Sequence, residues 1–264
     1  MTVLESILLG VLQGVTEFIP VSSSGHLIVM REMMGLGDIP VLFDVMLHIA
    51  TLIVIVFFFR ARVVAVFRSS VRWVLRRNTD ADAIDLVLAR LIVIATIITG
   101  VGGYLIARLD LQRFPRLAAA FFLVTAAILI VSRFARGSRG YDAIRTRDGV
   151  FIALAQVFAV LPGISRSGTT ITAGLLCGLG RREAAEFSFL ISIPAMLGAL
   201  AYTLRDVGDL TLVVTPVALV VGFLASGLAG YFALGLLVKL IRGGRLWVFS
   251  VYLIPLGIIG LFLF

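Results

Sequence analysis

Two stretches of this chain resemble each other, and each interrupts a hydrophobic segment with polar residues. Residues 13–37 align with residues 156–180 at a constant shift of 143 and without a gap, and eight of the 25 positions are identical. Both stretches contain two serines separated by one residue and followed by a glycine. In the first stretch these are Ser22, Ser24 and Gly25, and in the second they are Ser165, Ser167 and Gly168. Interrupted hydrophobic segments at corresponding positions of two halves are typical of repeat-built membrane proteins, whose site lies between the repeats.

The composition also indicates a membrane protein. Of the 264 residues, 60% are apolar and 14% are charged, and the mean hydropathy is +1.11. Soluble domains have about half apolar and about a quarter charged residues. We therefore predict an all-α polytopic membrane protein. It forms a single membrane domain over residues 1–264, with residues 1–135 and 145–264 as the two halves of the repeat.

The net charge of +8 and the isoelectric point of about 10.7 are high enough to raise the question of nucleic-acid binding. The basic residues lie in short loops between apolar runs, however, and membrane orientation explains that pattern better. We expect no nucleic-acid partner.

The single cysteine, Cys177, excludes a disulfide within the chain, and no zinc-binding spacing of Cys and His occurs. We interpret Cys177 as a packing residue.

A helix needs about 20 apolar residues to span the hydrocarbon core of a membrane. Two apolar regions, 3–37 and 149–180, are interrupted by proline, glycine and serine. Backbone of this kind is tolerated at membrane depth only where protein or a water-filled cavity surrounds it. We therefore predict two re-entrant helical hairpins there, together with six transmembrane helices. The six apolar runs that reach or approach the required length are 43–59, 86–107, 117–132, 186–204, 212–237 and 246–264.

The basic residues predict the orientation of these spans. Of the 23 lysines and arginines, seventeen fall on one side of the predicted spans, five fall on the other, and Arg166 lies in the second hairpin. The side with seventeen is cytoplasmic by the positive-inside rule. The two hairpins then enter from opposite sides, so the repeat has inverted topology. The basic segment 63–77 is either an amphipathic helix on the cytoplasmic membrane surface or an ordinary solvated loop helix.

Four ionisable side chains lie inside the predicted membrane segments, where a charge costs about 2.5–3.5 kcal/mol and indicates function by default. They are Glu17, His26, His48 and Arg166. Glu17 follows Gln13 by one helical turn, so the side-chain oxygens of the two residues share one face. Such oxygens suit Mg²⁺ or Ca²⁺, and we predict Glu17 and Gln13 as ligands of a divalent cation. The alternative is a structural Glu17 that binds a serine or an arginine.

The serines before His26 form a second candidate group. Histidine exchanges protons near neutral pH, and a hydroxyl beside a histidine is a common activated nucleophile. We predict His26 as the acid–base residue, with Ser23 as first choice of nucleophile, Ser22 as second choice, and water as the alternative. The structural interpretation of the same motif is a helix cap followed by a packed histidine.

The second hairpin carries the predicted phosphate-binding group. A guanidinium flanked by hydroxyls at a helix N-terminus suits phosphate oxygens, and the residues are Arg166, Ser165, Ser167 and Thr170. We expect the imidazole and the carboxylate of the first hairpin to face the guanidinium of Arg166. Alternatively, Arg166 only neutralises Glu17.

His48 and Asp44 lie one helical turn apart in the first predicted span. They either orient His26, line the cavity, or form a satisfied polar contact.

The three motifs Gln13-x-x-x-Glu17, Ser22-Ser23-Ser24-Gly25-His26 and Pro162-Gly-Ile-Ser-Arg-Ser-Gly-Thr-Thr170 together resemble those of the undecaprenyl-diphosphatase family, also called the bacitracin-resistance proteins. The resemblance covers the whole chain. It implies hydrolysis of undecaprenyl diphosphate to undecaprenyl phosphate and inorganic phosphate, which recycles the lipid carrier for peptidoglycan synthesis. It also implies a divalent cation and a site in the bacterial cytoplasmic (inner) membrane that opens towards the periplasmic side.

Carried over by position, the resemblance assigns an acidic motif to Gln13 and Glu17. It assigns the serine–histidine motif and the phosphate-binding motif to Ser22, Ser23 and His26 and to Ser165, Arg166, Ser167 and Thr170. Many members have glutamate at the position of Gln13, and the neutral amide weakens that residue as a metal ligand.

Two other functions fit parts of the same pattern. A secondary transporter or lipid flippase also uses inverted repeats and interrupted helices, and a fold does not determine a function. The other lipid-phosphatase superfamily has a similar Ser-Gly-His motif, but its later Ser-Arg motif with a second His and Asp is absent here. The expected partners are the lipid substrate and membrane lipids, and a homodimer is left open.

Overall fold

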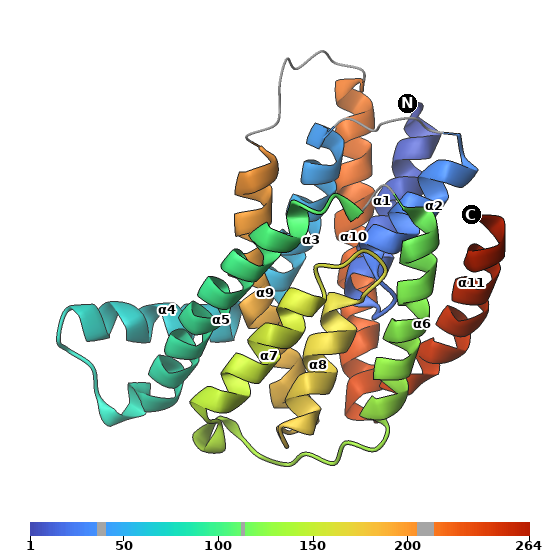
Figure 1. Cartoon of the computed structure of the whole chain (residues 1–264). Helices are drawn as coiled ribbons and strands as arrows, with labels where there is room; N and C mark the ends of the chain where they lie inside the picture. Colours follow the sequence, from blue (N-terminus) through green and yellow to red (C-terminus); the bar gives the residue numbers. More distant parts are fainter. Residues whose placement is uncertain (36–40, 112–113, 205–213) are drawn as a thin grey trace.

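The structure is a computed structural model that describes residues 1–35, 41–111, 114–204 and 214–264 (Figure 1). Within these ranges the regular elements are helices, and an isolated bridge joins Arg139 to Leu179. The α-helices are α1 (Val3–Phe18), α2 (Ser23–Met33), α3 (Val41–Phe58), α4 (Arg60–Val74), α5 (Ala83–Ala107), α6 (Pro115–Ser132), α7 (Thr146–Phe158), α8 (Arg166–Leu176), α9 (Arg181–Thr203), α10 (Pro216–Arg242) and α11 (Phe249–Leu263). Short 3₁₀ helices are η1 (Asp80–Asp82), η3 (Tyr141–Ala143) and η4 (Leu246–Val248).

The predicted all-helical membrane protein is confirmed at the level of its apolar helices. Among the described residues, α5 with the adjoining η1, α6, α9, α10, and α11 with the adjoining η4 are long and apolar enough to cross a membrane. A sixth span results if α3 and α4, which meet at an angle of 79°, are counted together. Each predicted apolar run therefore coincides with a helix, although part of the run 212–237 lies outside the described residues.

Each interrupted segment forms a pair of short helices. α1 and α2 are joined at residues 19–22, and α7 and α8 are joined at residues 159–165. The bounds of α2 and α8 differ by the same 143 residues as the sequence repeat. Residues 36 and 37, the end of the first predicted hairpin, lie outside the described residues. In Figure 1 the two pairs enter from opposite ends of the molecule, and their tips lie near its middle.

Proline and a serine cap explain why the chain breaks at the first tip. Ile19 precedes Pro20 and has an extended conformation, which a following proline favours. The hydroxyl of Ser22 then accepts a hydrogen bond from the backbone N–H of Gly25 at 3.5 Å and caps α2. The second tip is built similarly, because Gly163 after Pro162 has a φ of +92° and Ser165 caps α8.

The helix predicted over residues 63–77 is present as α4, which leaves the bundle at a sharp angle to α3 (Figure 1). It carries exposed apolar side chains next to its arginines, including Phe67 and Trp73, which are 66% and 62% exposed. A water-exposed loop helix would not be expected to present two large rings in this way. The side chains therefore favour the amphipathic membrane-surface helix over the solvated loop helix.

Each half of the chain packs one of its short helices against a long helix of the other half. α1 packs against α10 of the second half, and its repeat equivalent α7 packs against α5 of the first half. Small residues allow the first of these contacts, because a Cβ atom on Gly14 would lie 2.2 Å from the carbonyl oxygen of Ser226. Close backbone approach at small residues is a common basis of helix packing in membranes. This contact holds α1, and hence the first tip, against the second half.

Replacing Gly14 with alanine is predicted to separate α1 from α10 and to lower the stability. Overpacking of this kind costs about 1–3 kcal/mol, so the thermal unfolding temperature of the detergent-purified protein should fall clearly. Gly235 on α10 is the matched control, because a Cβ atom there meets nothing within 4 Å. If Gly14→Ala and Gly235→Ala unfold at the same temperature, the close packing of α1 on α10 is wrong.

Candidate active site

The tips of the two helix pairs are in direct contact. The hydroxyl of Ser167, in the first turn of α8, donates a hydrogen bond to the carbonyl oxygen of Phe18, the last residue of α1, at 3.1 Å. On the other side of this contact, a Cβ atom on Gly168 would lie 3.1 Å from the Cβ atom of Pro20. Residues separated by about 150 positions in the chain therefore form one continuous site.

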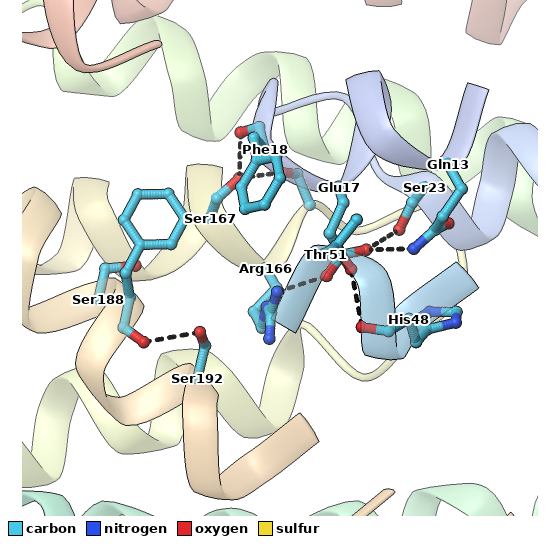
Figure 2. A network of polar contacts seen from close by, with 12 residues as sticks. Gln13, Glu17, Phe18, Ser23, His48, Thr51, Arg166, Ser167, Ser188 and Ser192 are labelled. Atoms are coloured by element: carbon cyan, nitrogen blue, oxygen red, sulfur yellow. Dashed lines mark hydrogen bonds and ion pairs between the residues drawn. The ribbon is translucent and has the colours of Figure 1, made fainter. Parts of the chain in front are cut away.

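The carboxylate of Glu17 is at the centre of this site (Figure 2). Arg166 donates to Oε1 of Glu17 at 2.5 Å, and the other oxygen, Oε2, accepts from Ser23 at 2.6 Å and from Gln13 at 3.0 Å. The side chain of Glu17 is only 7% exposed, and that of Arg166 is 19% exposed. Withdrawing charges from water is costly unless they are paired and hydrogen bonded, and this carboxylate has one cationic and two neutral donors.

Helix α6 holds the second tip in place behind Arg166. The hydroxyl of Thr125 donates to the carbonyl oxygen of Gly163 at 2.8 Å and accepts from the backbone N–H of Ser165 at 3.1 Å. Ser165 caps α8, so Arg166 is the first residue of that helix. A cation at a helix N-terminus opposes the helix dipole, and the carboxylate of Glu17 offsets this unfavourable position.

The serines of the two tips form repeated contacts. Ser22 and Ser24 have their hydroxyl oxygens 3.4 Å apart, and Ser165 and Ser167 have theirs at the same separation. Ser22 and Ser165 each accept from the glycine N–H three residues later. Ser23 occupies the position that corresponds to Arg166, and it is the serine whose hydroxyl reaches Glu17. The two halves therefore supply a hydroxyl and a guanidinium from equivalent positions.

Ser22 has a positive φ of 71°, which is uncommon for any residue other than glycine. Its carbonyl oxygen accepts from Nδ1 of His26 at 2.8 Å. Such backbone conformations persist only where the surroundings hold them, and they are frequent at functional sites. The equivalent Ser165 has an ordinary φ of −76°, so the strain belongs to the first tip alone.

We expected the imidazole of His26 to face Arg166, but both of its ring nitrogens bind other groups. Since Nδ1 donates to a carbonyl oxygen, Nε2 of the neutral ring accepts from the hydroxyl of Tyr252 on α11 at 2.9 Å. The ring is also packed against Phe122 of α6 and stacked on Tyr252, with centroid distances of 5.0 and 5.7 Å. Both nitrogens thus bind groups other than Arg166, and the aromatic contacts fix the ring beside α6 and α11.

Three other predicted residues are engaged in contacts of their own. The hydroxyl of Thr170 contacts Ser188 and donates to the backbone carbonyl of Arg166 at 2.8 Å. Asp44 is paired with Arg31, and Nδ1 of His48 bonds to the carbonyl oxygen of Asp44 at 2.9 Å. These contacts correspond to the satisfied polar contact that we weighed for Asp44 and His48, and neither residue binds the ring nitrogens of His26.

Sequence reasoning missed Thr125, Phe122 and Tyr252. Thr125 and Tyr252 are polar side chains within apolar runs, and this is the signal that would have drawn attention to them. Phe122 carries no such signal, because phenylalanine is common in membrane helices. The role of all three depends on which helix lies behind each tip, and the repeat pattern does not include that information.

Gln13 and Glu17 offer the oxygens that a divalent cation would need. Oε1 of Gln13 is buried and has no hydrogen-bond partner among the described residues, whereas Nε2 donates to Glu17. Among the described residues, no group of three or more His, Cys, Asp and Glu side chains is placed to hold a metal ion. Mg²⁺ bound for phosphate chemistry commonly takes one or two protein ligands, with substrate phosphates and water as the others. One carboxylate and one unpaired amide oxygen fit that arrangement.

The sequence model of a known family, described as bacitracin resistance protein BacA, matches residues 6–259 of the chain. The chain belongs to the BacA family. This match includes both tips and every residue that contacts Glu17 at the site.

Several curated relatives agree with the BacA assignment. A protein of Treponema denticola named undecaprenyl-diphosphatase is 39% identical over 98% of this chain and 96% of its own length. Proteins with the same name from Methanobrevibacter smithii and Idiomarina loihiensis are 38% and 34% identical. The first covers 98% of this chain and 96% of its own length, and the second covers 100% of both.

Breaking the pair of Glu17 and Arg166 from one side is predicted to destabilise the protein more than removing both charges. Glu17→Gln leaves a partly buried guanidinium without its carboxylate, a loss on the order of 3 kcal/mol. The double variant Glu17→Gln with Arg166→Gln removes that unpaired charge and should recover part of the loss. Thermal unfolding in detergent of the two single variants and the double variant measures the coupling. Additive losses would contradict a direct contact between the two side chains.

Proposed function

We propose that this chain hydrolyses undecaprenyl diphosphate to undecaprenyl phosphate and inorganic phosphate, and thereby recycles the lipid carrier for peptidoglycan synthesis. The observation that carries the proposal is the contact of Arg166 and Ser23 with one carboxylate, where two polar tips meet inside an apolar helical protein. Membership of the BacA family and the names of the relatives support the same reaction. The enzyme is a phosphatase that acts on a membrane lipid.

The charge distribution of the site suits a diphosphate. α2 and α8 both begin at the tips, so the N-terminal N–H groups and dipoles of two helices favour an anion there. Arg166 adds a planar guanidinium that binds phosphate oxygens with two parallel hydrogen bonds. Phosphoryl transfer requires mainly positioning and stabilisation of charge. We infer that Arg166 exchanges its contact with Glu17 for the substrate phosphates when substrate binds.

The same contacts support a nucleophile and a base for the reaction. An oxygen, either the hydroxyl of Ser23 or a water molecule in its place, attacks the terminal phosphorus and forms a new P–O bond. The bond from that phosphorus to the bridging oxygen breaks, and undecaprenyl phosphate leaves. Glu17 accepts the proton, because its carboxylate already accepts the hydrogen bond of Ser23 at 2.6 Å. If Ser23 is the nucleophile, water then hydrolyses the phosphoserine and releases inorganic phosphate.

The role of His26 in this scheme is to fix the first tip. Its bond to the Ser22 carbonyl holds the residue that caps α2, and Tyr252 orients the ring from the other side. Direct proton transfer by His26, as we expected from the sequence, stays a prediction that requires the ring to turn towards the substrate. Ser165, Ser167 and Thr170 support Arg166 through the cap of α8 and the contacts of its first turn.

A divalent cation, Mg²⁺ or Ca²⁺, completes the proposal. Glu17 and the unpaired Oε1 of Gln13 would hold it, and it would neutralise charge on the phosphate oxygens. The attack and the proton transfer described above involve Ser23, Glu17 and water. A cation bound there would reduce the repulsion between the anionic substrate and the carboxylate of Glu17.

We propose the cytoplasmic (inner) membrane of a bacterium as the location, with six spans, two re-entrant hairpins and inverted topology. Seventeen of 23 basic residues fall on one side of the predicted spans, which supports that side as the cytoplasmic one. The first hairpin then opens to the periplasmic side, where Ser23 and Glu17 would receive the substrate. A secondary transporter or flippase would need sealed vesicles to act, whereas a phosphatase releases phosphate in detergent.

Replacing Arg166 with lysine is predicted to reduce phosphate release from undecaprenyl diphosphate by roughly tenfold to a hundredfold in detergent, because the charge remains but the two-pronged contact is lost. Arg136→Lys is the control, since Arg136 is exposed, lies outside the helices and belongs to neither tip. Near-normal turnover of Arg166→Lys would refute the proposed phosphate contact. Absence of phosphate release by the unaltered protein would refute the phosphatase itself.

Ser23→Ala is predicted to reduce turnover by at least about a hundredfold if Ser23 is the nucleophile. Ser24→Ala is the neighbouring control, because the hydroxyl of Ser24 contacts only the hydroxyl of Ser22 among the described residues. Mass spectrometry of acid-quenched enzyme should then detect phosphate on Ser23. A Ser23→Ala variant with normal turnover and no phosphoserine in the unaltered protein would assign the attack to water.

A further inference from the structure

A cavity with a mixed basic and apolar lining lies at the end of the molecule opposite to the chain termini (Figure 1). It has a volume of about 350 Å³ and lies where α3 ends, α4 and α9 begin, and α10 ends. None of its lining residues contacts Glu17 or belongs to the two tips. The cavity is therefore separate from the site at the tips.

The charged residues that line this cavity are mostly basic. They are four arginines, Arg62, Arg181, Arg182 and Arg242, and one acid, Glu186. The charge of Arg62 is compensated by two carboxylates, because Nε donates to Glu186 at 2.6 Å and Nη1 donates to Asp85 at 3.0 Å.

The charges of the other three arginines have no carboxylate partner among the described residues. Arg181 donates to the backbone carbonyl of Arg242 at 3.3 Å, which does not neutralise it. Within the described ranges, no carboxylate lies at ion-pair distance from Arg181, Arg182 or Arg242. Three uncompensated guanidinium groups around one cavity favour a phosphate anion, whose oxygens match their paired N–H donors.

The cavity is also lined by apolar side chains. Phe58 and Phe59 come from the bend between α3 and α4, and Val238 and Ile241 come from the last turns of α10. The bend directs α4 away from the bundle, with Phe67 and Trp73 exposed along it. An amphipathic helix of this kind lies at the level of the lipid headgroups, so the cavity beside its first turn opens at that level. Apolar side chains next to arginines suit a headgroup together with the start of its acyl chains.

We propose that this cavity binds the phosphate headgroup of an anionic membrane lipid, with Arg181, Arg182 and Arg242 on the phosphate and with the phenylalanines and aliphatic side chains along the lipid chain. Basic pockets between membrane helices recognise anionic lipid headgroups by the same combination of contacts. A free phosphate ion shares the charge but makes no use of the apolar side chains. The site is independent of the phosphatase chemistry, because its residues are separate from the residues at the tips.

Native mass spectrometry of the detergent-purified full chain tests this site. Phosphatidylglycerol and phosphatidylcholine are added in equal amounts, and the bound share of each is measured with and without inorganic phosphate. The test variant is Arg181→Gln with Arg182→Gln. The control is Arg136→Gln with Arg147→Gln, which removes the same charge from exposed positions that do not line the cavity. Thermal unfolding of each protein verifies that it is folded.

We expect the unaltered protein and the control to retain phosphatidylglycerol about tenfold more than phosphatidylcholine, and the test variant to lose this preference. Inorganic phosphate at the same concentration as the lipid should leave the preference unchanged. An unchanged preference in the test variant would overturn the proposal. Displacement of the lipid by inorganic phosphate at equal concentration would also overturn it, and would assign the cavity to a free phosphate ion. Neither result bears on phosphate release from undecaprenyl diphosphate, which is measured separately.

Discussion

A carboxylate and a guanidinium withheld from water stabilise this fold only as a pair, and each comes from a different half of the chain. Glu17 lies in the last turn of α1 and Arg166 begins α8, so their 2.5 Å contact requires both tips to reach the same point. A charge left alone in such surroundings costs several kcal/mol. The pair therefore links the folding of the two halves to the assembly of the site. In the proposed reaction, a substrate phosphate replaces the carboxylate of Glu17 as the partner of Arg166, whose guanidinium the fold already holds at this point.

Neighbouring helices supply hydrogen-bond partners and packing contacts to the non-helical backbone at the tips. Peptide groups outside regular helix need partners when lipid surrounds the protein, and α6 supplies them. Thr125 binds both sides of the second tip, and Phe122 packs on His26 next to the first. Because α1 packs against α10 and α7 packs against α5, each tip lies against the opposite half of the chain. The position of Ser23 beside Glu17 is a consequence of this packing.

Much of this arrangement follows from the sequence, and what does not follow has a physical reason. Apolar run length predicted the helices, and the repeat predicted that α2 and α8 correspond and that Glu17 and Arg166 belong to one site. The direction of the His26 ring did not follow, because it depends on Tyr252, 226 residues away, and on the positive φ of Ser22. The cavity at the α3–α4 bend was also missed. Its arginines appeared in the sequence only as evidence of orientation.

The convergence of the tips is the central claim, and a cysteine cross-link measures it most directly. In a Cys177→Ala background, the Cβ atoms of Pro20→Cys and Gly168→Cys lie 3.1 Å apart, a little closer than the roughly 3.5–4.5 Å that a disulfide spans. A mild oxidant should join the two introduced cysteines within the chain, as seen by mass spectrometry of the linked peptides. A control pair of Pro20→Cys with Gly235→Cys on α10 should stay unlinked. If the thiols introduced by Pro20→Cys and Gly168→Cys each react with a maleimide but never with each other, the two tips do not meet and the proposed site does not exist.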